Sequence, residues 1–152
     1  MEIQSDFKEL LELLNAHKVE FIVVGGYALA FHGSPRFTGD IDVFVKADED
    51  NAKKVLEVLK EFGLGSINLE INDFNQPNKV IQLGVPPVRI DIMTSLTGIS
   101  WEQADAGKEK GDYAGVEVYY LGKDDLIKNK KELARKKDQA DLESLGKKDM
   151  TD

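Results

Sequence analysis

Cysteine is absent from this chain of 152 residues, so disulfide bridges and thiolate-bound metal ions are excluded. No apolar run approaches the roughly 20 residues that a membrane-spanning helix needs, so no membrane segment is expected. The first ten residues, MEIQSDFKEL, contain acidic side chains and lack the apolar stretch of a secretory signal. We therefore expect a cytoplasmic protein.

Basic side chains are outnumbered by acidic ones. The chain has 20 Lys and Arg residues against 28 Asp and Glu residues, a formal net charge of −8. A surface with this excess of negative charge repels the phosphate backbone of nucleic acids. Binding of nucleic acid through overall charge is therefore not expected. Binding of a nucleotide that carries a divalent cation remains compatible with this net charge, because the cation offsets the phosphate charge. Only the segment 123–137, rich in Lys and Arg, offers a local basic surface.

The composition is that of one folded domain, with 41% apolar and 32% charged residues. The spacing of apolar residues predicts helices and strands that alternate along the chain. Predicted helices cover 3–16, 27–32, 50–62, 123–134 and 138–145, with a short one near Trp101. Predicted strands cover 20–24, 40–46, 67–71, 79–84, 88–93 and 116–121. The order predicts an α/β fold (α+β in the narrower sense), in which residues 1–152 form a mixed sheet flanked by helices.

Two acidic residues stand two positions apart in the predicted strand DIDVFVK, so Asp40 and Asp42 point to one face. Like charges about 6 Å apart repel by roughly 3 kcal/mol at an effective dielectric constant near 20, which a cation would relieve. Asp91 alternates in the same way in VRIDIM, and pairing of the two strands would bring three carboxylates together. Such hard oxygen ligands suit Mg²⁺ or Mn²⁺. The spacing alone fits solvated strand acids equally well.

The pair Gly25-Gly26 separates the strand 20–24 from the following helix. Glycine lets the backbone turn sharply and lets a ligand approach it closely. The free N–H groups at the start of a helix attract phosphate. An ordinary strand-to-helix turn explains the pair as well. The glycines therefore indicate a phosphate site only in combination with the acids.

In combination, these motifs resemble the DNA polymerase β-type nucleotidyltransferase superfamily. The matching pattern is VVGG, thirteen intervening residues, and then DIDVFV, with RIDIM supplying a third acid. The resemblance covers residues 20–93 as a catalytic core. The segment SPRFTGDIDVFV and the helices over 123–146 are similar to small bacterial and archaeal members, which extends the resemblance to most of the chain.

The resemblance implies a metal-dependent transfer of a nucleoside monophosphate from ATP or another NTP to a hydroxyl acceptor. Gly25 and Gly26 would hold the triphosphate through backbone N–H groups. Asp40 and Asp42 would bind Mg²⁺ or Mn²⁺, with Asp42 bridging two ions. Asp91 would hold the catalytic ion and orient or deprotonate the acceptor hydroxyl.

Four further residues are candidate contacts of a nucleotide. Arg36 and Thr38 precede the acids, and Arg36 could grip a phosphate or form a surface salt bridge. Lys130, in the basic segment, could reach the triphosphate or could belong to a solvated helix face. Tyr27 could stack on a base, but core packing is the favoured interpretation.

The sequence leaves the acceptor open among a protein side chain, an RNA end and a small hydroxylated molecule such as an aminoglycoside. No extra domain for gripping an acceptor is evident, so a homodimer or a partner protein could complete the groove. The resemblance also implies a second function, an antitoxin that binds a HEPN-like toxin with or without catalysis. A third hypothesis is a non-catalytic nucleotide sensor.

Overall fold

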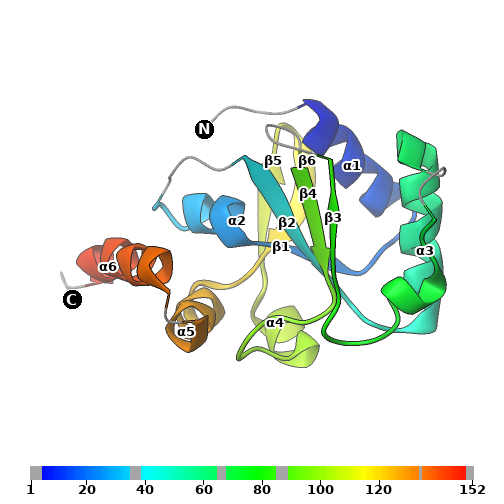
Figure 1. Cartoon of the computed structure of the whole chain (residues 1–152). Helices are drawn as coiled ribbons and strands as arrows, with labels where there is room; N and C mark the ends of the chain where they lie inside the picture. The colour runs from blue at the N-terminus through cyan, green and yellow to red at the C-terminus, as the bar shows by residue number, and fades with distance from the viewer. Residues whose placement is uncertain (1–4, 35–38, 65–67, 85–88, 134, 150–152) are drawn as a thin grey trace.

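Six strands of the described residues form one mixed sheet in the order β3-β4-β2-β1-β6-β5 (Figure 1). The computed structural model describes residues 5–34, 39–64, 68–84, 89–133 and 135–149. β1 pairs with β6 and β2 with β4 in parallel, while the other neighbours are antiparallel. The strands are β1 (Phe21–Val24), β2 (Asp40–Val45), β3 (Val80–Leu83), β4 (Arg89–Met93), β5 (Glu109–Tyr113) and β6 (Val116–Tyr120).

Helices lie on both sides of this sheet, as the predicted α/β fold requires. Figure 1 shows α1 and α3 on one side, and α2, α5 and α6 on the other. The α-helices are α1 (Ser5–Ala16), α2 (Gly25–Phe31), α3 (Glu49–Leu59), α4 (Trp101–Gly107), α5 (Lys123–Leu133) and α6 (Lys136–Asp149). None of the helices in the described ranges is long and apolar enough to cross a membrane.

Strand β2 shows how the sequence pattern positions the site. Ile41, Val43 and Val45 are at most 1% exposed and belong to the hydrophobic core. Because successive side chains point to opposite faces of a strand, Asp40 and Asp42 lie on the other face. Apolar burial on one face therefore fixes the register that presents the acids on the other.

Two parts of the predicted secondary structure are wrong. The strand predicted over 67–71 does not form in its described part, and Ile71–Asp73 is a short 3₁₀-helix. The side chains of Glu70 and Asp73 each accept a backbone N–H at the start of this turn, which competes with strand pairing. Strand β5 was not predicted, because its sequence EKGDY lacks apolar alternation.

Candidate active site

Three carboxylates meet on one face of the sheet, across the parallel pair of β2 and β4. Asp42 lies directly opposite Asp91 in the register, and Asp40 lies opposite Arg89. One carboxylate oxygen each from Asp40, Asp42 and Asp91 lies within 4.8 Å of the other two. The structure thus brings together the three acids that the sequence singled out.

Gly25 lies against this cluster from the side of β1. Its φ of +67° is in the left-handed region, which favours glycine. A Cβ atom at this position would lie 2.0 Å from Oδ2 of Asp42, and no side chain atom fits there. Gly26 follows it, buried at the start of α2. The absence of a side chain at Gly25 therefore makes room for the carboxylate of Asp42.

The electrostatics of the cluster are unfavourable without a cation. Burial, and then the charges of Asp40 and Asp91, raise the pKa of Asp42 to about 8. Burial also raises the pKa of Asp91, although the hydrogen bond from Arg89 works in the opposite direction. Asp42 and Asp91 therefore hold protons more tightly than isolated acids do, as expected where like charges share one site.

Arg89 compensates part of this charge, a role that the sequence analysis missed. Its Nη2 atom donates to Oδ2 of Asp40 and to Oδ2 of Asp91, each over 3.1 Å. The available signal was its position two residues before Asp91, which places both side chains on one strand face. Arg89 thereby holds two of the three acids in place.

The donor set fits a divalent metal ion. Oδ1 of Asp91 is buried and accepts no hydrogen bond within the described part of the chain. A buried oxygen without a partner is costly, and a bound cation would satisfy it. Three carboxylates at this separation provide the oxygen ligands that Mg²⁺ and Mn²⁺ prefer.

The profile of the family described as "Nucleotidyl transferase of unknown function (DUF2204)" matches residues 3–151. The chain belongs to this family. A comparison of the nucleotidyl transferase chain with curated protein sequences found no significant match.

The family description confirms the resemblance to nucleotidyltransferases, and solved structures share the fold. The candidate nucleotidyltransferase TM1012 from Thermotoga maritima has a TM-score of 0.62 and 18% identity, over 97% of this chain and 96% of that one. The antibiotic-resistance factor ANT(2'')-Ia has a TM-score of 0.62 and 12% identity, over 93% and 80% of the chains. The lincosamide antibiotic adenylyltransferase LnuA, bound to lincomycin, has a TM-score of 0.54 and 13% identity, over 96% and 98%.

Lys130 of the nucleotidyl transferase chain lies in a buried ion-pair cluster between α5 and α6. It is 4% exposed, and its Nζ lies 3.3 Å from Asp138 and 3.1 Å from Asp141. Arg135 donates from Nε to the same Asp138 over 2.6 Å. Because two aspartates engage the ammonium group, the structure gives Lys130 a role in joining the two helices. The signal that the sequence analysis missed is the pair of acids three positions apart at the start of α6.

The remaining predicted residues are placed as follows. Arg36 and Thr38 lie outside the described residues. Tyr27 is 6% exposed and packs edge-on against Phe7 and Tyr113, which confirms its core position.

The raised pKa of Asp42 predicts how the stability of the metal-free protein depends on pH. In the unfolded chain Asp42 ionises near pH 4, but in the folded chain only near pH 8, so the folded state binds more protons between these values. The free energy of unfolding therefore falls as pH rises through this window and levels off above pH 8. Each pH unit of displacement corresponds to about 1.4 kcal/mol.

We expect Asp42→Asn, measured in EDTA, to melt several degrees above the wild type at pH 8.5 and close to it at pH 4.5. About 1 kcal/mol moves Tm by about 2–4 °C in a chain of this size. Thermal unfolding of both proteins across pH 4–9 measures the difference. A difference in Tm that does not grow with pH would contradict the assignment of the raised pKa.

Proposed function

We propose that the protein transfers a nucleoside monophosphate from a nucleoside triphosphate, ATP, to the hydroxyl group of an acceptor. The observation that carries this proposal is the cluster of Asp40, Asp42 and Asp91, with one buried oxygen of Asp91 left unpartnered. The name of LnuA, an adenylyltransferase, supports ATP as the donor. The membership in a nucleotidyl transferase family supports the reaction class.

The three acids and the glycine pair have different functions in the proposed reaction. Asp40, Asp42 and Asp91 would hold Mg²⁺ or Mn²⁺, which when bound would supply positive charge to stabilise the charge that develops on the transferred phosphoryl group and on the leaving pyrophosphate. Gly25 and Gly26 bind the triphosphate through backbone N–H groups, and the missing side chain of Gly25 leaves room for the carboxylate of Asp42 beside them. Most of the rate enhancement then comes from positioning and charge neutralisation.

Asp91 acts on the acceptor. It orients the acceptor hydroxyl and accepts the proton of that hydroxyl as the oxygen attacks. The acceptor oxygen forms a bond to the α-phosphorus as the bond from that phosphorus to the bridging oxygen breaks. Pyrophosphate leaves with the bonding electron pair.

Arg36 and Thr38 stay proposed phosphate contacts, since they precede Asp40 in the chain. Lys130 is left out of the nucleotide contacts, because Asp138 and Asp141 already engage its ammonium group. The complete acid set favours catalysis over a nucleotide sensor. The HEPN-like toxin partner, the RNA acceptor and the homodimer stay predictions from the sequence.

Calorimetric titration with ATP tests the proposed function. In the presence of Mg²⁺ we expect saturable binding, and in EDTA we expect that binding to be lost, because the acids alone repel the triphosphate. Release of pyrophosphate from Mg²⁺-ATP then reports transfer, because water can serve as the acceptor when no other acceptor is present. Binding that is equally tight in EDTA would contradict the metal site.

A further inference from the structure

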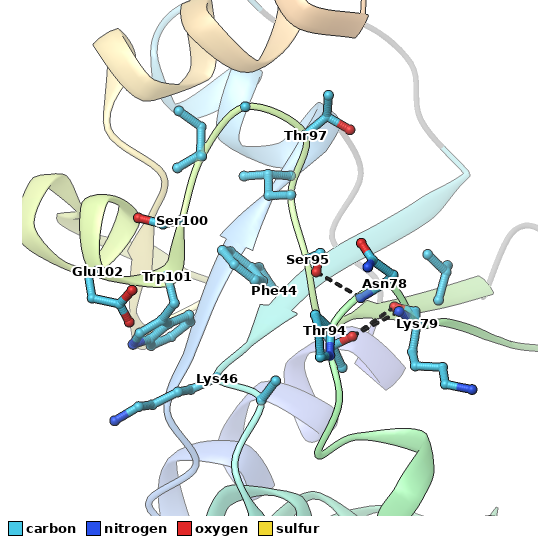
Figure 2. A pocket seen from close by; sticks show the side chains of 16 residues that line it. Phe44, Lys46, Asn78, Lys79, Thr94, Ser95, Thr97, Ser100, Trp101 and Glu102 are labelled. Carbon is cyan, nitrogen blue, oxygen red and sulfur yellow. Dashed lines mark hydrogen bonds between the residues drawn. The ribbon is translucent and has the colours of Figure 1, made fainter.

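A cavity of about 820 Å³ opens at the ends of β2 and β4, where the chain passes over the sheet toward α4 (Figure 2). Its wall is formed by the last residues of β2, the start of β3 and the connection of residues 94–102. Pockets that bind small molecules measure about 300–1,000 Å³. The size therefore suits a small molecule better than a macromolecule.

The register places this cavity beside the acids and on the same face of the sheet. Gln82, Asp91 and Asp42 form one cross-strand row, and Val80, Met93 and Phe44 form the next. Adjacent rows on one face are two residues apart, or about 6.6–6.8 Å. Val80 and Phe44 line the cavity, so it begins one row from Asp42 and Asp91.

The cavity lies on the acceptor side of the proposed reaction. Gly25, the proposed triphosphate contact, approaches Asp42 from β1, whereas Val80 lies on the edge strand β3, on the opposite side of β2. In an in-line displacement the attacking oxygen and the leaving pyrophosphate are on opposite sides of the phosphorus. With the triphosphate toward β1, the acceptor enters from β3 and β4.

Aromatic rings form one wall of the cavity. The ring of Trp101 packs edge-on against Phe44, with centroids 5.2 Å apart and planes at 76°. Phe44 is 2% exposed, and Trp101 is only partly buried and lies beside the cavity (Figure 2). An indole face accepts the apolar face of a ring by stacking.

Polar groups on the opposite wall suit a hydroxylated ligand. Oγ of Ser95 accepts the backbone N–H of Asn78 over 2.8 Å (Figure 2), and a hydroxyl that accepts still has a proton to donate. The carboxamide of Asn78 can both donate and accept. The two residues face the aromatic wall across the cavity in Figure 2.

The charge of the lining opposes a cationic ligand. Two lysines and one acid line the cavity, Lys46, Lys79 and Glu102, a local charge of 2 − 1 = +1 in a chain of net charge −8. Lys46 is only loosely engaged, 3.8 Å from Glu20 and 3.7 Å from Asp48. Lys79 forms no ion pair with any described residue of the chain.

We propose that this cavity binds the acceptor, and that the acceptor is a small hydroxylated ring compound that is anionic rather than cationic. The assignment of the cavity as the acceptor site rests on the proposed nucleotidyl transfer. The preference for an anionic ligand rests on the residues that line the cavity alone. It predicts weaker binding of aminoglycosides, whose several ammonium groups would meet the two lysines.

The first experiment uses three sugars with one ring and different charge: glucuronate, glucose and glucosamine. Trp101 is the one tryptophan of the chain, so its indole N–H gives a single signal in a ¹H–¹⁵N spectrum. We expect glucuronate to shift this signal saturably, with a dissociation constant at least fivefold below that of glucosamine. No nucleotide or metal is present, so failure of the proposed function cannot affect this result.

Charge reversal supplies the control. Lys79→Glu is expected to remove the preference for glucuronate, whereas Lys54→Glu, the same change at an exposed position on α3, is expected to keep it. No saturable shift with any sugar, equal binding of glucosamine, or an unchanged preference in Lys79→Glu would overturn the proposal.

The second experiment tests the acceptor role. Saturating glucuronate is expected to change the rate of pyrophosphate release from Mg²⁺-ATP at least twofold in the wild type. An unchanged rate with the sugar bound would separate the cavity from the reaction and overturn that role. Failure of the proposed function would instead appear as absent ATP binding in calorimetry.

Discussion

Asp42→Asn is expected to reduce nucleotidyl transfer at least 1,000-fold and to abolish the Mg²⁺ dependence of ATP binding. Asp42 lies at the centre of the acid cluster, opposite Asp91 and against Gly25. Loss of one carboxylate ligand removes several kcal/mol of transition-state charge stabilisation, and each 1.4 kcal/mol is about tenfold in rate. Pyrophosphate release and calorimetry in Mg²⁺ measure the two effects.

The control for this prediction is Asp50→Asn, which makes the same change at an exposed position on α3. It is expected to transfer at the rate of the wild type. Asp42→Asn is expected to fold, because the substitution removes repulsion in the metal-free cluster. Transfer retained by a folded Asp42→Asn protein would refute the role of Asp42 as a metal ligand.

Gly25→Ala is expected to reduce transfer at least 100-fold and to lower stability by about 1–2 kcal/mol. The loss of stability follows from the φ of +67°, a conformation that costs about 1–2 kcal/mol for a residue with a Cβ. The loss of transfer follows from the new Cβ, which would displace Oδ2 of Asp42. Displacement of a reacting group by about 1 Å can cost about 100-fold in rate.

Gly115→Ala separates these two effects. Gly115 also has a positive φ, +88°, but a Cβ there would meet no atom within 4 Å. This variant is expected to lose a similar amount of stability, measured by denaturant unfolding, and to keep its transfer rate. Equal transfer by Gly25→Ala and Gly115→Ala would show that Gly25 is needed only for its backbone conformation.

Strands β2 and β4 could be predicted because each has one apolar face with a strict period of two. Ile41 and Val43 alternate with Asp40 and Asp42, and burial of the first pair determines where the second lies. Strand β5 has no such signal. It fits because Gly111 leaves room for the rings of Phe31 and Tyr120, a contact between segments far apart in the sequence.

The candidate site was predictable where its residues follow from strand alternation and hidden where they depend on tertiary contacts. Asp91 shares the alternation of Asp42, so convergence needed only that the two strands pair. The burial of Lys130 could not be foreseen, because it requires α6 to fold back on α5 and present Asp138 and Asp141. Arg89 had a positional signal but no chemical one until Asp40 was placed opposite it.

The parallel pairing of β2 and β4 also has a consequence for folding. Asp42 and Asp91 are 91 − 42 = 49 positions apart, so they meet only after a long loop has closed. Contacts of this separation form slowly, and here the final approach is opposed by like charges. A cation that binds only the paired strands would stabilise the native state by mass action. The pairing of β2 and β4 that creates the candidate catalytic centre is therefore opposed, in the metal-free chain, by repulsion between the carboxylates that it brings together.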